Sequence, residues 1–205
     1  MKKIKEICDK LCRDKYRNIA IFFFFMQIIV VIRNLSTDYT VFFWFCDFAP
    51  GVYGVLFLLR KDDAVRGFVN IGLIPQIIFI FGIFYKLFFD VSLLGAATDS
   101  LPLSTFYVAS TLFIHTSSII ALIIVRKRKP SRKTLLYSLL FLIVMYFMTL
   151  GFTSPEGFVN YVYAQGSLFD FDIPYYTYLW IPLTFIIVVL PTHIIQYIVW
   201  RIGKR

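Results

Sequence analysis

Two residues that could do chemistry stand side by side in an apolar stretch of this sequence. Cys46 and Asp47 interrupt the run VFFWFCDFAPGV at positions 41–52. A thiol can act as a nucleophile, and a carboxylate can orient a histidine beside it. Ionisable groups in so apolar a segment are costly and usually face the interior of a helical bundle. We therefore take this pair as the first candidate for a functional site.

Both histidines of the chain also lie in apolar segments. His115 occurs in FIHTSS and His193 in LPTHIIQY. From the helical rise per residue, Cys46 and His115 lie roughly 10 and 15 Å below the outer ends of their predicted helices. Gln27 and Gln76 fall in about the same layer, whereas His193 is deeper, roughly 25 Å from the outer end of its helix. The sequence therefore predicts a polar layer that contains Cys46 and His115.

A thiol and an imidazole at matched depth predict a nucleophile–base pair. His115 would take the proton of Cys46, and the thiolate would attack an acyl carbon. Asp47 or His193 would orient the histidine, as an acid does in a catalytic triad. Apolar walls suit the acyl chain of a membrane lipid as substrate, and this chemistry needs no cofactor. The side chains expected to donate to the developing oxyanion are Gln76, Thr116 and Ser117.

Six apolar segments must position these residues. The chain has 205 residues, of which 59% are hydrophobic and 20% aromatic. Runs of about 18 or more apolar residues are typical of membrane spans. The sequence predicts an all-α polytopic transmembrane bundle of six helices within residues 18–205. The predicted spans are 18–33, 39–59, 68–88, 105–125, 134–152 and 176–200.

Two segments outside the spans have distinct compositions. Residues 1–17 place apolar and cysteine side chains on one face at helical spacing, which predicts an amphipathic helix at the membrane interface. The segment 153–175 is long, aromatic and acidic, and we expect it to form a cap over the outer face of the bundle. Its acidic residues are Glu156, Asp170 and Asp172.

The distribution of Lys and Arg predicts the orientation of the bundle. Nineteen of the 21 lie in the N-terminal arm, the 60–66 and 126–133 loops and the C-terminal tail, and only Arg33 and Lys86 lie on the other side. Because cytoplasmic loops carry the excess of positive charge, both termini are predicted to be cytoplasmic. The formal charge of +9 follows largely from this topology, so we expect no nucleic-acid partner. The basic run at 126–133 is interpreted as a positive-inside loop, with a patch that binds lipid headgroups or nucleic acid as the alternative.

Two other classes of protein remain open. Pro75-Gln76 resembles the helix break of PQ-loop and SWEET-type carriers, which favours a small transporter with a midplane polar site, although the other half of the chain has no second Pro-Gln. In a non-catalytic membrane protein, Cys46 would be a small apolar residue, and Asp47 and His115 would hydrogen-bond between helices. No metal is expected, because the two histidines lie on different spans without a supporting ligand set.

Several short motifs resemble those of a family of uncharacterised prokaryotic six-span integral membrane proteins. These motifs are FWFCDFAP, LIPQ, FIHTSS, VNYV and PTH. The layout is also distantly similar to the androgen-induced hydrolases of fatty-acid esters of hydroxy fatty acids and to a related Cys-His transmembrane acyltransferase. These resemblances imply an integral protein of the prokaryotic cell membrane.

The same resemblance implies roles for two residues. The nucleophile of span 2 falls on Cys46, where the hydrolases have Thr and the acyltransferase has Cys, and the histidine of span 4 falls on His115. Asp47 and His193 have no assigned counterpart. The expected function is that of an intramembrane lipid acyl hydrolase or acyltransferase, with hydrolysis and transfer both open.

Overall fold

The computed structural model describes residues 2–35, 39–90, 104–155, 159–163 and 173–204, and the side chains from residue 14 onward. Within these ranges the chain is helical and contains no strand. The elements are α1 (Lys2–Asn34), η1 (Tyr39–Phe43), α2 (Phe45–Leu58), α3 (Asp62–Phe89), α5 (Thr105–His115), α6 (Ser117–Val125), α7 (Arg132–Phe152), η3 (Val159–Tyr161), α8 (Tyr176–Thr184), η5 (Phe185–Val189) and α9 (Leu190–Ile202).

Five of the helical segments are long and apolar enough to cross a membrane. They are Asp14–Asn34, Asp62–Phe89, Thr105–Val125, Arg132–Phe152 and Tyr176–Ile202. The prediction of an all-helical chain with several membrane-length apolar helices is therefore confirmed. The predicted second span, 39–59, is instead divided into η1 and α2, which meet at the extended residue Trp44. With its 14 residues, α2 alone is about 21 Å long, less than the roughly 30 Å of a bilayer core.

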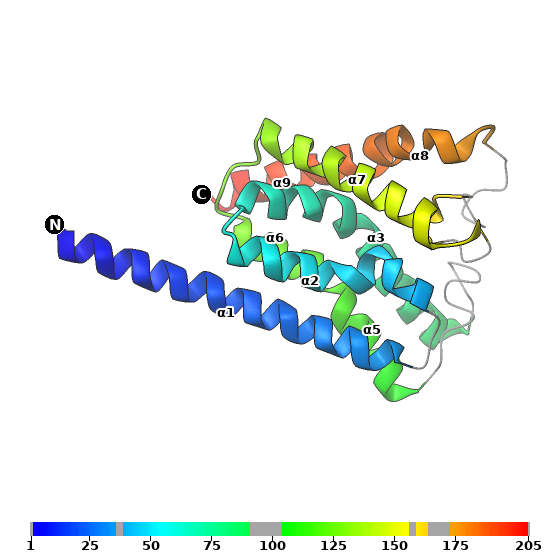
Figure 1. Ribbon diagram of the computed structural model, residues 1–205, viewed down its shortest axis with the longest axis horizontal. Coiled ribbons are helices and arrows are strands. Elements are labelled where there is room, and N and C mark those ends of the chain that lie inside the picture. The colour runs from blue at the N-terminus through cyan, green and yellow to red at the C-terminus, as the bar shows by residue number, and fades with distance from the viewer. Residues whose placement is uncertain (1, 36–38, 91–103, 156–158, 164–172, 205) are drawn as a thin grey trace.

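The helices form one bundle around α3. Figure 1 shows α1 along one side, α7, α8 and α9 on the opposite side, and α2, α3 and α6 between them. α3 packs against α7, α6 and α2, and α1 packs along α2. The N-terminal and C-terminal ends lie at the same end of the bundle, together with the α2–α3 and α6–α7 connections (Figure 1). This arrangement gathers the basic loops at one end.

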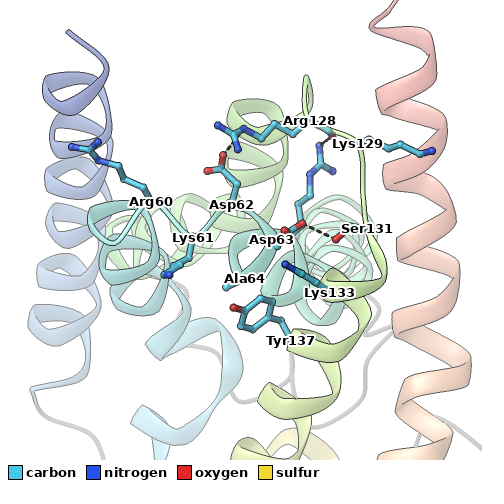
Figure 2. Close-up of a pocket in the computed structure, with 11 residues that line it drawn as sticks. Arg60, Lys61, Asp62, Asp63, Ala64, Arg128, Lys129, Ser131, Lys133 and Tyr137 are labelled. Carbon is cyan, nitrogen blue, oxygen red and sulfur yellow. Dashed lines mark hydrogen bonds and ion pairs between the residues drawn. The ribbon is translucent and has the colours of Figure 1, made fainter. Parts of the chain in front are cut away.

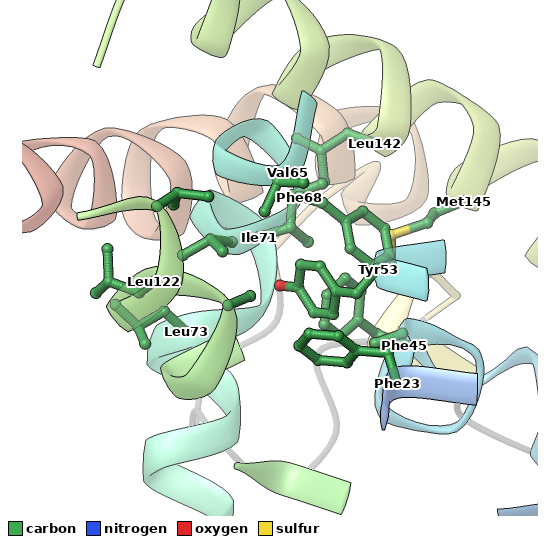
Figure 3. Close-up of a cluster of buried hydrophobic side chains, with 14 of the residues drawn as sticks. Phe23, Phe45, Tyr53, Val65, Phe68, Ile71, Leu73, Leu122, Leu142 and Met145 are labelled. Atoms are coloured by element: carbon green, nitrogen blue, oxygen red, sulfur yellow. The ribbon is translucent and has the colours of Figure 1, made fainter. Parts of the chain in front are cut away.

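Aromatic side chains fill the centre of the bundle. Tyr53 of α2 lies between Phe23 of α1 and Phe68 of α3, with ring centroids 5.3 and 5.1 Å away (Figure 3). Phe45 contacts Phe68 at 4.7 Å. Because lipid tails are as apolar as these side chains, van der Waals packing must hold such helices together. The Tyr53 hydroxyl is satisfied by a hydrogen bond to Ser118 Oγ at 2.9 Å.

Three expectations about the helices need correction or refinement. The predicted interfacial segment 1–17 and the first span form a single helix, α1, so no break marks their boundary. The interfacial location of residues 1–17 stays a prediction. The predicted span 105–125 is interrupted at Thr116, which separates α5 from α6. The last span contains a π-helical turn, Phe185–Val189, just ahead of Pro191. The acidic residues of the predicted cap, Glu156, Asp170 and Asp172, lie outside the described residues.

Candidate functional site

Asp47 is half of a buried ion pair. Its side chain accepts a hydrogen bond from Arg33 Nη2 at the end of α1, and another from Asn34 Nδ2 at 3.0 Å. Arg33 and Asp47 are only 8% and 4% exposed. Burying a charge is costly unless it is paired and hydrogen-bonded, and both conditions are met here. The acid that was predicted to orient a histidine therefore has a cation opposite it.

The same network extends to His115. Arg33 Nη1 donates to Thr111 Oγ1 at 3.1 Å, and His115 Nδ1 lies 2.7 Å from the backbone carbonyl oxygen of Thr111. The imidazole is buried and stacks on the ring of Phe79, with centroids 4.2 Å apart. Because a carbonyl oxygen only accepts, Nδ1 carries the hydrogen, and Nε2 keeps a lone pair that can accept a proton. The imidazole is thus held in the tautomer of a general base.

Cys46 lies in the first turn of α2, next to Asp47. Its thiol is free and partly buried. The start of this helix is fixed by Asn160, whose Oδ1 accepts a hydrogen bond from Phe45 N at 2.8 Å and whose Nδ2 donates to Phe43 O at 2.8 Å. Asn160 has φ +51°, in the left-handed region that asparagine tolerates better than most residues. Sequence reasoning noted VNYV as a motif but did not predict this capping role.

The structure brings Cys46 and His115 into one polar cluster without joining them directly. Asp47, Arg33 and Thr111 connect the two through the hydrogen bonds described above. Among the described residues, no hydrogen bond links the Cys46 thiol to the imidazole of His115. The catalytic pairing stays a prediction. Neither Asp47 nor His193 is hydrogen-bonded to His115 in this part of the chain, and the Thr111 carbonyl orients the ring instead.

The three predicted oxyanion donors gather at the α5–α6 break. Gln76 Nε2 donates to Ser117 Oγ at 3.0 Å, and Gln76 Oε1 accepts from Ser118 N at 2.9 Å. Thr116 Oγ1 donates to the carbonyl of Phe113 at 2.6 Å. The Gln76 side chain therefore satisfies an amide at the beginning of α6. Whether any of the three contacts a substrate stays a prediction.

His193 belongs to a second buried cluster. Its Nδ1 lies 3.3 Å from Asn70 Nδ2, and Asn70 Oδ1 accepts from Gln196 Nε2 at 2.7 Å. Arg66 Nη1 donates to Gln196 Oε1 at 2.8 Å, and Asn70 also donates to Ser138 Oγ at 3.0 Å. These residues come from α3, α7 and α9, so the cluster ties three helices together.

Two arginines had been placed at the membrane surface by the sequence. Arg33 was counted among the outer residues and Arg66 in the 60–66 loop, but the structure buries both, with Arg66 in α3 and only 1% exposed. In the sequence, Arg33 is unusual because it lies at the end of a span on the side that carries few positive charges. A cation that breaks this pattern near an intramembrane acid is a candidate partner for that acid.

Two further observations bear on the alternatives. Pro75 and Gln76 lie inside α3, which is a single helix from Asp62 to Phe89, so no helix break of the carrier type occurs there. Among the described residues, no group of three or more His, Cys, Asp or Glu side chains could hold a metal ion.

Comparison of the chain with protein-family models, with curated proteins and with solved structures found no match.

Proposed function

We propose that this protein is an intramembrane enzyme that cleaves or transfers a lipid acyl group, with Cys46 as nucleophile and His115 as general base. The observation that carries the proposal is the hydrogen bond from His115 Nδ1 to the Thr111 carbonyl, 2.7 Å long. This hydrogen bond leaves Nε2 of His115 as the proton acceptor. The site is buried, and its hydrogen bonds extend through Thr111 and Arg33 to Asp47, the residue next to the thiol.

The ion pair between Arg33 and Asp47 reduces one electrostatic obstacle to this function. A lone ionised Asp47 beside Cys46 would oppose formation of the thiolate by repulsion between like charges. Arg33 compensates Asp47, so the thiol adjoins a neutral ion pair instead of an isolated negative charge. The resemblance to the Cys-His acyltransferases and to the hydrolases of hydroxy-fatty-acid esters points to the same two residues.

The proposed reaction has two steps. His115 Nε2 takes the Cys46 proton while the sulfur attacks the acyl carbonyl carbon, and collapse of the tetrahedral intermediate gives a thioester and releases an alcohol that takes its proton from His115. Water, or the hydroxyl of a second lipid, then attacks the thioester and regenerates the thiol. Gln76, Thr116 and Ser117 are the proposed oxyanion donors, and donation by Gln76 or Ser117 would replace their mutual hydrogen bond.

The substrate and location follow from the same proposal. A membrane lipid or another acyl chain would reach the site from the apolar surroundings of the helices. We place the protein in a prokaryotic cell membrane with both termini cytoplasmic, on the basis of the charge distribution and the motif resemblance.

A probe experiment tests the pair. In a Cys8→Ala/Cys12→Ala background, Cys46 is the sole thiol, and an alkyne-tagged acyl probe with a thiol-reactive head should label it. His115→Ala should slow labelling by about a hundredfold or more, because general-base assistance is worth roughly that much. His193→Ala is the matched control, since this histidine belongs to the second cluster, and it should label at the rate of the parent. Equal labelling rates in the two histidine variants, both folded, would show that His115 does not activate the thiol.

A further inference from the structure

A cavity of about 550 Å³ lies at the other end of the bundle from Cys46, where the α2–α3 and α6–α7 connections meet (Figure 2). The length of α2, about 21 Å, separates this cavity from the thiol. Its volume is in the range of small-ligand sites. Six cationic side chains contribute to its lining, namely Arg60, Lys61, Arg66, Arg128, Lys129 and Lys133.

The acidic residues of the cavity already have partners. Asp62 pairs with Arg128 Nε at 2.7 Å and accepts from the Tyr16 hydroxyl at 2.9 Å. Asp63 accepts from Ser131 Oγ at 2.9 Å and from Thr134 Oγ1 at 3.3 Å. These two carboxylates are therefore engaged, and they offset only part of the positive charge around the cavity.

Among the described residues, Arg128 pairs with an acid, Arg66 is hydrogen-bonded and Lys129 lies over the rings of Tyr197 and Trp200, whereas the other three lining cations have no such contact. Within the described residues, Arg60, Lys61 and Lys133 form no ion pair, and Figure 2 shows Lys61 and Lys133 near Tyr137, with Arg60 directed toward α1. Like charges that line one cavity repel each other, so an anion bound in the cavity would be stabilised.

Arg66 gives a second and independent indication of a ligand. Its Nη atoms are satisfied by Gln196 Oε1 and by the backbone carbonyls of Val125 and Arg128. Its Nε is buried and has no hydrogen-bond partner, although the side chain lines the cavity and is only 1% exposed. A buried donor without a partner is rare and costly, and here it belongs to a residue that lines the cavity.

Backbone groups at the cavity also favour a negatively charged ligand. Asp63 and Ala64, in the first turn of α3, line the cavity, as do Ser131 at the N-cap of α7 and Lys133 in its first turn. The amino-terminal ends of two helices thus lie against one space. Helix amino termini carry a partial positive charge and unpaired N–H groups that attract anions, phosphate in particular.

We infer that this cavity binds a phosphate group, presented either by the headgroup of an anionic phospholipid or by a soluble phosphate compound. A phosphate matches the site because its several acceptor oxygens and its charge of more than one can engage Arg60, Lys61 and Lys133 together. This site is separate from the proposed acyl chemistry and does not depend on it.

Binding to the full chain in a zwitterionic detergent tests the inference. Isothermal titration at constant chloride concentration would use three probes, which are dihexanoyl phosphatidate, inorganic phosphate and dihexanoyl phosphatidylcholine. Phosphatidate should bind saturably with one site per chain, and phosphatidylcholine at least about tenfold more weakly, because its headgroup has no net charge. Comparable binding of inorganic phosphate would assign the site to the phosphate group alone, whereas binding of phosphatidate alone would assign it to a lipid headgroup.

A matched pair of variants separates a built site from diffuse charge. Arg60→Gln/Lys61→Gln/Lys133→Gln should weaken binding of the phosphate probe by at least about tenfold. Arg126→Gln/Lys127→Gln/Arg201→Gln removes the same charge from exposed positions that do not line the cavity, and it should retain the parent affinity within about twofold. Arg66 stays unchanged in both variants, since its buried network supports the fold. Equal loss in the two variants, or no saturable binding of either phosphatidate or phosphate to the parent, would overturn the inference.

Discussion

The ion pair between Arg33 and Asp47 is held in surroundings that penalise either charge alone. Both side chains are about 5% exposed, and they form hydrogen bonds with each other and with Asn34 and Thr111. Desolvation of two charges can offset most of their attraction, so the pair need not add much stability as a whole. Removing one partner is different, because an unpaired charge is then left in an apolar interior.

This difference gives a prediction at the residue scale. Arg33→Gln or Asp47→Asn alone should lower the free energy of unfolding by about 3 kcal/mol or more. The double variant should lose less than the sum of the two single losses, because neither charge is then left unpaired. Unfolding of the four proteins in the same detergent gives the coupling energy, and strictly additive losses would contradict a direct interaction.

The residues of the candidate site differ in how far the sequence could predict them. Cys46, Asp47 and His115 were identified because polar groups stand out in an apolar run. Arg33 was not, since a cation at the end of a span normally lies in the headgroup region, and only the folded chain shows Asp47 within its reach. The role of the Thr111 carbonyl could not be predicted from the sequence. Every residue in a helix has a backbone carbonyl one turn before it, so no residue type marks this contact.

At the scale of elements, the position of α3 depends on how closely it approaches α7. Gly67 lies against Thr134, Tyr137 and Ser138 of α7, and its carbonyl accepts a hydrogen bond from Ser138 Oγ at 3.0 Å. A Cβ atom at this glycine would lie 2.6 Å from Tyr137 Cβ and 2.9 Å from the backbone oxygen of Thr134. Small residues commonly allow this kind of close packing between membrane helices.

Gly67→Ala should therefore destabilise the protein by about 1–3 kcal/mol, because atoms close to the α7 backbone would have to move. Gly151→Ala is the matched control within a helix, since nothing lies within 4 Å of its added Cβ. That change should be neutral or stabilising by up to about 1 kcal/mol, as alanine favours the helix. Thermal unfolding of both variants measures the contrast, and similar shifts in Tm would argue against a close α3–α7 contact.

The two helix interruptions show why element boundaries were harder to predict than the elements. α2 begins at Phe45 because Asn160, more than a hundred residues away in the chain, accepts from its backbone N–H. α6 begins after Thr116 while Gln76 of α3 accepts from Ser118 N. Hydrophobic periodicity detects apolar segments, but these breaks are stabilised by side chains on other helices and leave no local signal.

At the scale of the whole molecule, polar chemistry is divided between the two ends of the bundle. The Cys46 cluster and the cavity lined by basic residues lie at opposite ends of α2, and the basic connections and both terminal ends lie with the cavity (Figure 1). The common end of the termini fits the predicted even number of membrane passes, in which η1 and α2 together would form one pass. The charge bias then predicts which end faces the cytoplasm.

That orientation can be measured with single cysteines in a Cys8→Ala/Cys12→Ala/Cys46→Ala background. Lys127→Cys and Lys204→Cys introduce exposed thiols at the basic end, and Thr105→Cys introduces one at the opposite end, at the start of α5. In sealed right-side-out vesicles, a membrane-impermeant maleimide should react with the thiol at 105 and spare those at 127 and 204 until the membrane is permeabilised. The reverse pattern would place the basic end outside, against the positive-inside bias. Reaction at 127 but not at 204 would place the two positions on opposite sides of the membrane. An odd number of passes would then separate them, and α7 and the α8–α9 segment would not both cross the membrane.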